Sequence, residues 1–330
     1  MRGDGYEEDD GLFWWYMAGG MALGLGVAAV AIYATGQGPA VRRLATSAMS
    51  HLPGHSERRL VGGTHTFDMT HGAFDGRPGA TVVIPHGYDA GKPLDLAIYV
   101  HGFGGCVENA VRDADGPCHD GGGNHHASHL AKQLADANVN TILVLPEILR
   151  EQRSGAPGRL RDHGGLAALL NELLGEHMSA LLGGAKSLSD VRNISLSGHS
   201  GGYTAMAAII RAGDIERQLK EVALFDALYG DAGTFQSWAR AHHGPSHRLV
   251  DIYSSAGGTD NNSRALAASL EHSVPSDGFW MDDSVADVQA DVLPRHGCVF
   301  KHTSLSHTDV SRVWPQRVWA SSPAFERINA

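Results

Sequence analysis

Strand-like, largely apolar stretches alternate with stretches of helical periodicity along most of this chain. An apolar run of strand length without polar alternation is typical of a strand buried on both faces of a sheet. Residues 94–102 form a near-continuous run of this kind, 139–147 is a second, and shorter strand-like segments with more polar residues lie at 191–198, 221–230, 248–258 and 298–304. We therefore expect these six segments to be the central strands of one buried sheet.

The segments between these runs have the spacing of amphipathic helices. Leucines recur at intervals of three and four residues in 164–182, as on one face of a helix. Residues 126–138 show the same spacing, and 202–213 is expected to be a helix of mostly small residues. Strands that alternate with helices predict an α/β fold, a mostly parallel sheet with helices on both faces. Chemistry in such sheets lies at the carboxyl ends of the strands.

The beginning of the chain follows a different pattern. Residues 11–41 contain no charged side chain, and about 20 apolar residues suffice to cross a bilayer as a helix. Acidic residues precede this segment, which argues against a cleaved signal peptide because such peptides usually start with basic residues. We predict an acidic tail at 1–11, a transmembrane anchor or signal-like segment at 12–36, a linker at 37–59 and an α/β domain at 60–330.

Two signals disagree about the side of the membrane on which the domain lies. Arg42 and Arg43 directly follow the apolar segment, which favours a cytoplasmic domain. Cys106 and Cys118 lie close together in one loop-like segment, and a disulfide there is typical of a domain outside the cytoplasm. We expect a periplasmic or extracellular domain and keep the cytoplasmic side as the alternative. The third cysteine, Cys298, lies in an apolar run and is expected to be a buried thiol.

Charge and histidine content limit the partners. The formal net charge is −10 and no basic run is present, so we expect no nucleic-acid partner, because phosphates require a basic face. His125 and His129 have the i, i+4 spacing of metal ligands on a helix. No glutamate stands between them, and 20 histidines produce such spacings easily. We therefore expect no metal site.

Two glycine-rich turns carry the candidate chemistry. Residues 198–202 read Gly-His-Ser-Gly-Gly between a predicted strand and a predicted helix, the setting of a nucleophile on a strained turn. This predicts Ser200 as the nucleophile. Residues 101–105 read His-Gly-Phe-Gly-Gly at the end of another strand. The backbone N–H groups of Phe103 and Gly201 are predicted to stabilise an oxyanion together.

From about residue 60 to its C-terminus the chain resembles the α/β-hydrolase-fold serine hydrolases of the esterase and lipase superfamily. The motifs that carry the resemblance are "VIPHGYDAGKPLDLAIYVHGFGG" and "SLSGHSGG". The first is distantly similar to polyester-depolymerase and feruloyl-esterase-type members. The resemblance implies the α/β-hydrolase fold, catalysis without a cofactor, and the chain order nucleophile, acid, histidine.

That order places the catalytic histidine after the last strand. His307 lies in the segment that follows the strand at 298–304 and is the predicted base. Asp260 follows the preceding strand in a glycine-bearing turn, the usual acid position of the fold. Asp226 lies at the end of the strand before that one, where a minority of members carry the acid. We favour Asp260 as the acid and keep Asp226 as the alternative.

A group of arginines follows the strand at 139–147. Its members are Arg150, Arg153, Arg159 and Arg161. They are interpreted either as a solvated surface or as a rim that binds an anionic substrate.

The sequence as a whole predicts a membrane-anchored serine hydrolase that cleaves carboxylic esters through an acyl-enzyme. A peptidase or amidase of the cell envelope that uses the same triad is the first alternative. A non-catalytic binding protein on the same fold is the second. The expected partners are an ester or amide substrate and the lipid bilayer.

Overall fold

The computed structural model describes residues 62–75, 78–118, 123–148 and 155–328. The predicted tail, membrane segment and linker at 1–59 therefore lie outside the described residues, and the predictions for them stay predictions. Among the helices of the described part, none is long and apolar enough to span a bilayer.

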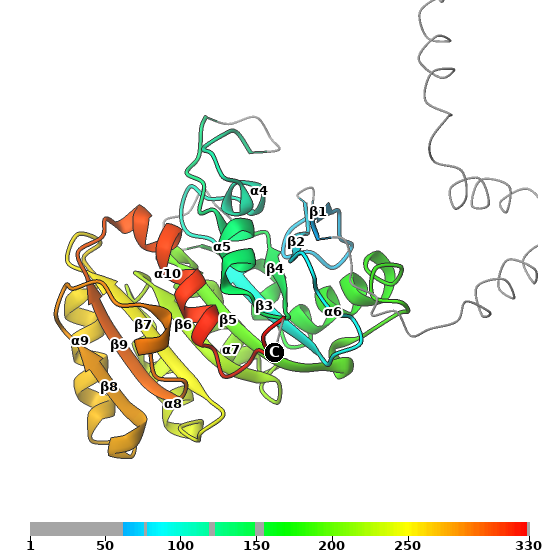
Figure 1. Cartoon of the computed structure of the whole chain (residues 1–330). Helices are drawn as coiled ribbons and strands as arrows, with labels where there is room; N and C mark the ends of the chain where they lie inside the picture. Colours follow the sequence, from blue (N-terminus) through cyan, green and yellow to red (C-terminus); the bar gives the residue numbers. More distant parts are fainter. Residues whose placement is uncertain (1–61, 76–77, 119–122, 149–154, 329–330) are drawn as a thin grey trace, which may run out of the picture. The chain divides into compact units, whose positions relative to one another are not determined.

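The described strands form one nine-stranded sheet with the order β1-β2-β4-β3-β5-β6-β7-β9-β8 (Figure 1). Strand β2 is antiparallel to β1 and to β4, and all other neighbouring pairs are parallel. The strands are β1 (Gly63–Phe67), β2 (Ala80–Ile84), β3 (Leu94–Val100), β4 (Ile142–Pro146), β5 (Val191–His199), β6 (Leu219–Phe225), β7 (Arg248–Ser254), β8 (Phe279–Asp282) and β9 (Gly297–Thr303). The prediction of an α/β fold with a mostly parallel sheet is confirmed, and all six predicted central strands are present.

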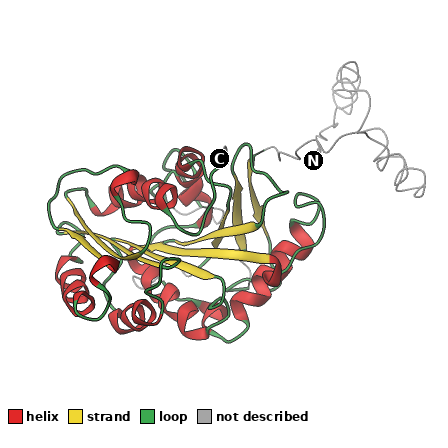
Figure 2. Ribbon diagram, turned by 60° about the horizontal axis from the view of Figure 1, so that its bottom comes forward, coloured by secondary structure: helices red, strands yellow, loops and turns green. Residues whose placement is uncertain are grey.

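Helices cover both faces of this sheet (Figure 2). They are α4 (Val107–Val111), α5 (Leu130–Ala137), α6 (Gly165–Glu172), α7 (Tyr203–Ala212), α8 (Ala232–Ala241), α9 (Asp260–Glu271) and α10 (His307–Ser321). One core cluster joins α6, α7, α8 and α9 to the sheet, and a second joins α4, α5 and α10 to its other face. The helix predicted at 164–182 is shorter than expected, because α6 passes into a π-helical turn at Leu173–His177 that includes the poor helix former Gly175.

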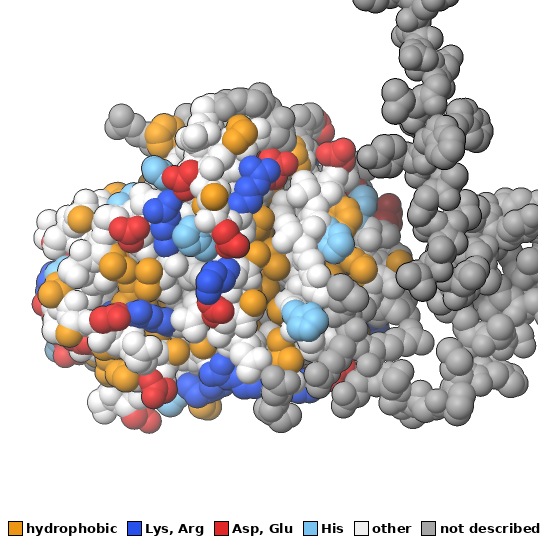
Figure 3. Space-filling view, turned by 45° about the horizontal axis from the view of Figure 1, so that its top comes forward, with side chains coloured by type: hydrophobic (Ala, Val, Ile, Leu, Met, Phe, Trp, Pro, Cys, Tyr) orange, Lys and Arg blue, Asp and Glu red, His pale blue; other side chains and the backbone are white. Residues whose placement is uncertain are grey.

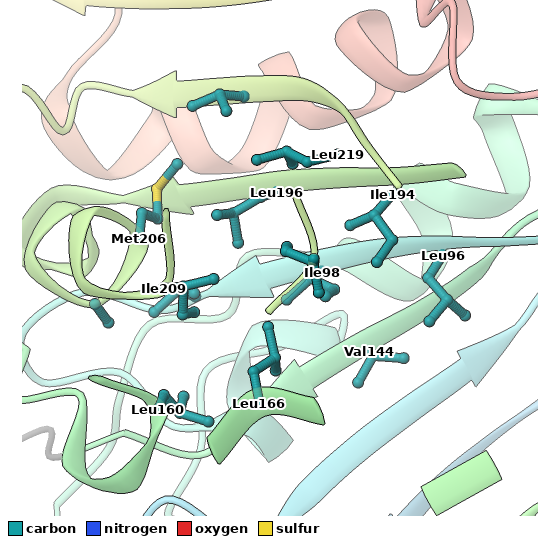
Figure 4. Close-up of a cluster of buried hydrophobic side chains, with 14 of the residues drawn as sticks. Leu96, Ile98, Val144, Leu160, Leu166, Ile194, Leu196, Met206, Ile209 and Leu219 are labelled. Atoms are coloured by element: carbon teal, nitrogen blue, oxygen red, sulfur yellow. The ribbon is translucent and has the colours of Figure 1, made fainter. Parts of the chain in front are cut away.

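The centre of the sheet is packed on both sides. Every residue of β3 and β4 is buried, as their continuous apolar runs predicted. On one face, Ile98 of β3 and Val144 of β4 belong to the same apolar cluster as Leu166 of α6 and Ile209 of α7 (Figure 4). This packing holds the carboxyl ends of β3, β4 and β5 as a rigid support for the loops that follow them.

A buried ion pair lies at the opposite end of the sheet. Arg248 of β7 and Glu221 of β6 are both fully buried. The guanidinium donates to Glu221 Oε2 over 2.7 Å and to the Val318 carbonyl of α10 over 2.8 Å. The other carboxylate oxygen accepts from Ser195 Oγ over 2.7 Å. The pair therefore connects β5, β6 and β7 to the last helix.

Replacing Arg248 by methionine is expected to lower the free energy of unfolding by about 3–5 kcal/mol, because Glu221 would remain buried without its cation. Urea unfolding at neutral pH measures the change. The double variant Arg248→Met/Glu221→Leu should recover most of the loss, since an apolar pair of similar volume replaces the charges. A single variant as stable as the wild type would contradict this assignment.

A second ionisable group lies in the core without a cation beside it. Asp251 of β7 is fully buried. Burial raises the pKa of its carboxyl group to about 7, and the nearby charge of Asp226 acts in the same direction. The folded protein therefore retains the Asp251 proton over a pH range in which the unfolded chain has already lost it.

Replacing Asp251 by asparagine is expected to change how stability depends on pH. A carboxyl group whose folded pKa is raised contributes stability below its unfolded pKa of about 3.9. This contribution declines by up to about 1.4 kcal/mol per pH unit as the pH rises toward the folded pKa. The variant should lack this pH-dependent loss. Its free energy of unfolding relative to that of the wild type should therefore rise between pH 4 and about 7 and then level off. Urea unfolding over this pH range tests it, and parallel curves for the two proteins would contradict it.

Candidate active site

Ser200 lies on a sharp turn between β5 and α7. The strand ends at His199, and a short 3-10 turn over Ser200–Gly202 leads into the helix that starts at Tyr203. Ser200 has a φ of 54°, in the left-handed region. Such a conformation costs a non-glycine residue on the order of 1–3 kcal/mol and is found where the surrounding structure enforces it. The strand, strained turn and helix predicted for this segment are all present.

Close packing against the end of β3 explains the glycines around this serine. A Cβ atom on Gly202 would lie 2.7 Å from the carbonyl oxygen of Val100, and one on Gly198 would lie 2.7 Å from Met206 Sδ. Across the turn, a Cβ on Gly102 would lie 2.6 Å from Ser200 Cβ. The two glycine motifs therefore face each other, and only glycine allows this approach.

The structure brings Ser200, His307 and Asp226 into one hydrogen-bonded chain. His307 is the first residue of α10. Its Nε2 lies 2.8 Å from Ser200 Oγ, and its Nδ1 lies 2.7 Å from Asp226 Oδ2. Because a carboxylate can only accept, Nδ1 carries the hydrogen and Nε2 is left to accept the serine proton. This is the arrangement of a nucleophile, a base and an acid that orients the base.

The Asp226 carboxylate is fully buried and densely hydrogen bonded. It accepts from the Ser254 N–H over 3.0 Å, from Ser254 Oγ over 2.8 Å and from Thr259 Oγ1. Burial alone would raise the pKa of Asp226, but the hydrogen bonds from His307, Thr259 and Ser254 outweigh it and lower the pKa. The group is therefore held as an anion beside the histidine.

The preference for Asp260 needs correction. Asp260 is the first residue of α9, and its carboxylate accepts from Ser255 Oγ over 3.3 Å. The turn after β7 carries it onto the helix N-terminus, where the helix dipole favours a negative charge. Asp226 instead has a left-handed φ of 48° directly after β6, and this conformation accompanies a carboxylate that reaches His307. Asp226, the alternative, thus replaces Asp260 as the candidate acid.

The predicted oxyanion donors lie beside the nucleophile. Phe103 follows Gly102, whose backbone packs against Ser200, and Gly201 is the buried residue after the serine. Phe103 is 55% exposed, so core packing does not hold its side chain. The role predicted for its N–H group stays a prediction.

A cavity of about 400 Å³ lies next to these residues. It is lined by Tyr99, His101, Gly102, Phe103, Gly104, Gly105, Cys106, Ala110, Asn124, His125, His126, Ser128, His199, Ser200, His307, Thr308 and Ser311. No aspartate, glutamate, lysine or arginine belongs to this described lining. On the molecular face in Figure 3, acidic and basic side chains are interspersed. The described lining beside Ser200 is thus rich in histidine and hydroxyl groups and contains no permanently charged side chain.

Two of the four predicted rim arginines can be located. Arg159 donates to the Gly72 carbonyl over 2.9 Å and pairs with Asp75 over 2.7 Å. Arg161 is an exposed side chain 3.8 Å from Asp162. Neither lines the cavity at Ser200. Arg150 and Arg153 lie outside the described residues, so the rim hypothesis stays a prediction for them alone.

His199, the variable residue of the Gly-x-Ser-x-Gly motif, has a role that the sequence did not predict. Its Nε2 donates to the backbone carbonyl of His307 over 2.8 Å, and the two rings lie 4.5 Å apart. Burial lowers the pKa of His199 to about 4, and the proximity of His307 adds to the effect. His199 therefore stays neutral near pH 7 and holds the start of α10 without adding a charge.

The cysteine predictions are confirmed. Cys106 and Cys118 form a disulfide, which attaches the start of α4 to the following loop. Cys298 is a free, buried thiol of β9, and burial raises its pKa to about 11. The histidine pair considered for a metal does not have helical geometry, because α5 begins only at Leu130 and His129 is in the left-handed region.

No family model matches the sequence, and no curated protein matches it. Solved structures similar to the chain include several esterases. A mutant of the feruloyl esterase module from Clostridium thermocellum, complexed with sinapinate, is 12% identical with a TM-score of 0.47, covering 80% of this chain and 88% of that one. A ferulic acid esterase from Anaeromyces mucronatus is 12% identical with a TM-score of 0.41, covering 81% and 92%. A thermophilic esterase from Thermogutta terrifontis, with butyrate bound, is 10% identical with a TM-score of 0.41, covering 78% and 92%. Similarity at these low values does not assign a function to this chain.

Proposed function

We propose that this protein is a serine hydrolase that cleaves carboxylic esters through an acyl-enzyme intermediate. The observation that carries the proposal is the hydrogen-bonded chain from Ser200 Oγ through His307 to Asp226. A serine hydroxyl becomes a useful nucleophile only when a positioned base takes its proton. This chain supplies such a base, oriented by a buried carboxylate.

Each residue has a distinct role in the proposed reaction. Ser200 Oγ attacks the acyl carbon while His307 Nε2 accepts its proton and then delivers it to the leaving alcohol. Asp226 holds the tautomer of His307 and stabilises the imidazolium. The N–H groups of Phe103 and Gly201 stabilise the oxyanion, and water then releases the acyl group by the same steps in reverse order. No cofactor takes part in this scheme.

An uncharged polar ester suits the cavity better than an ionic one. The described lining offers hydroxyl, imidazole and amide groups but no arginine or lysine to pair with an anion. Among the described lining residues, a buried substrate carboxylate would therefore lose its hydration without gaining an ion pair. We further propose that residues 12–36 anchor the enzyme in a membrane with the domain in the periplasm or outside the cell, which rests on the sequence pattern and on the disulfide.

A substrate panel tests the proposal. Purified protein is assayed on p-nitrophenyl esters of increasing acyl length and on p-nitroanilides of matched peptides, and a fluorophosphonate probe is mapped by mass spectrometry. We expect ester hydrolysis and labelling at Ser200. Faster turnover of the anilides would support a peptidase or amidase instead. Folded protein that neither hydrolyses esters nor reacts with the probe would contradict an enzymatic function.

A further inference from the structure

A buried pair of side chains, His101 and Glu147, lies beneath the turn that carries the predicted oxyanion donor. His101 begins the His-Gly-Phe-Gly-Gly turn after β3, and Glu147 directly follows β4. Their side chains are only 3% and 2% exposed. His101 Nε2 lies 3.0 Å from Glu147 Oε1. Most polar groups buried to this degree in proteins are hydrogen bonded, so the partners of this pair indicate what it does.

The His101 ring reaches the peptide group that contains the Phe103 N–H. His101 Nδ1 lies 2.9 Å from the Gly102 carbonyl oxygen, which also accepts from the Gly105 N–H over 3.1 Å. The Gly102 carbonyl and the Phe103 N–H belong to one planar trans peptide and point in opposite directions. Holding this carbonyl therefore also fixes the direction in which the Phe103 N–H points.

Glu147 binds the His101 ring, which in turn binds the Gly102–Phe103 peptide group. Nδ1 must donate because a carbonyl oxygen can only accept, which leaves Nε2 to share a proton with the Glu147 carboxyl group. The Ile148 N–H also lies 3.4 Å from Nε2, but the carboxyl group is nearer. The second carboxyl oxygen accepts from the Val107 N–H over 3.1 Å. One side chain thus binds both ends of the turn, at His101 and next to the disulfide-bonded Cys106.

We infer that Glu147 and His101 are positioning residues for the oxyanion donor of Phe103. Glu147 fixes the His101 ring, the ring fixes the Gly102–Phe103 peptide, and the peptide presents its N–H to the tetrahedral intermediate. The inference rests on the proposed ester hydrolysis. It predicts that loss of Glu147 affects the transition state more than substrate binding, because the oxyanion forms only in the transition state.

The experiment compares Glu147→Met, which keeps the volume but removes both hydrogen bonds, with Glu147→Gln, which can still bond to His101 and to the Val107 N–H. For Glu147→Met we expect kcat per titrated active site to fall about 10- to 100-fold, below the 10²–10³ for complete loss of one donor. KM should change less than about threefold, since the ground state is largely unaffected. Affinity for phenylboronic acid, which forms a tetrahedral adduct with the serine, should fall in proportion to kcat. Glu147→Gln should stay within about fivefold of the wild type by the same reasoning.

Glu172 provides a matched control elsewhere in the fold. It is also largely buried, accepts from the backbone N–H groups of Thr70 and His71, and bonds to the His71 ring. Glu172→Met should reduce stability and leave kcat and phenylboronic acid affinity unchanged. If Glu147→Met does not fold, His101→Phe replaces it with the same expectation.

The outcomes separate this inference from the proposed function. Hydrolysis and phenylboronic acid binding by the wild type test the function itself. Suppose that the wild type hydrolyses the ester and binds phenylboronic acid. If the Glu147 or His101 variants then retain wild-type kcat, the positioning role is overturned. It is also overturned if they lose activity only through KM or through the number of titrated active sites. Glu147→Gln as defective as Glu147→Met would also overturn it, because the hydrogen bonds would then not be what orients the peptide.

Discussion

Replacing Ser200 by alanine is expected to lower kcat for ester hydrolysis by about 10⁶-fold, the scale seen when a triad serine is removed. Alanine has no hydroxyl to form the acyl-enzyme, so only oxyanion stabilisation and substrate positioning would remain. Initial rates on p-nitrophenyl butyrate measure the effect. Alanine has the same left-handed φ requirement as serine at this turn, so the variant should fold with nearly wild-type stability.

The control for this variant is Ser197→Ala, in the same strand. Ser197 is buried and donates to the Ile98 carbonyl over 3.2 Å, so its replacement alters a strand contact but not the turn. We expect Ser197→Ala to retain full kcat. Ser200→Ala that hydrolyses the ester at more than about 1% of the wild-type rate would refute the role of this serine, because a triad nucleophile contributes orders of magnitude more.

Replacing Asp226 by asparagine is expected to lower kcat by about 10⁴-fold, since the neutral side chain favours the wrong tautomer of the histidine. In the wild type, His307 Nδ1–H donates to Asp226 Oδ2 over 2.7 Å. An asparagine side chain is anchored there by donors from Ser254 and Thr259, which occupy its carbonyl oxygen and turn its NH₂ group toward the histidine. Nδ1 would then accept, Nε2 would carry the hydrogen, and the base would be blocked.

Asp260→Asn is the comparison that decides between the two aspartates. Its carboxylate contacts only Ser255 Oγ among the hydrogen bonds described, so we expect kcat to stay within about threefold of the wild type, as for surface substitutions remote from the chemistry. A profile of kcat against pH for each variant completes the measurement. A large loss in Asp260→Asn with a mild effect in Asp226→Asn would restore Asp260 as the acid.

Local sequence patterns were sufficient for the six central strands and for the nucleophile turn. The segment of β5 is strand-like, the residues after it are glycines around one serine, and the next segment consists of small helical residues. Each of these signals lies within about ten residues, where backbone sterics and burial act directly. The same holds for Cys106 and Cys118, whose pairing within one loop requires no knowledge of distant segments.

The acid could not be chosen in this way. Asp226 and Asp260 both follow buried strands that end at the same edge of the sheet, and the local sequence supports either one. The choice depends on the left-handed φ of Asp226 and on donors that come from Ser254 and Thr259. Such contacts join different strand ends, so they exist only once the sheet order is formed.

The sequence by itself determined the α/β class, the order of the strands along the chain, the strained turn at Ser200, and His307 as the histidine to test. Only the tertiary structure decided that Asp226 lies against His307, that His199 holds the start of α10, and that Glu147 reaches beneath the turn of Phe103. The physical reason is the range of the interactions. Periodicity and turn sterics act between residues close in the sequence, whereas the hydrogen-bond donors of a buried carboxylate come from distant segments that only the packed sheet brings together.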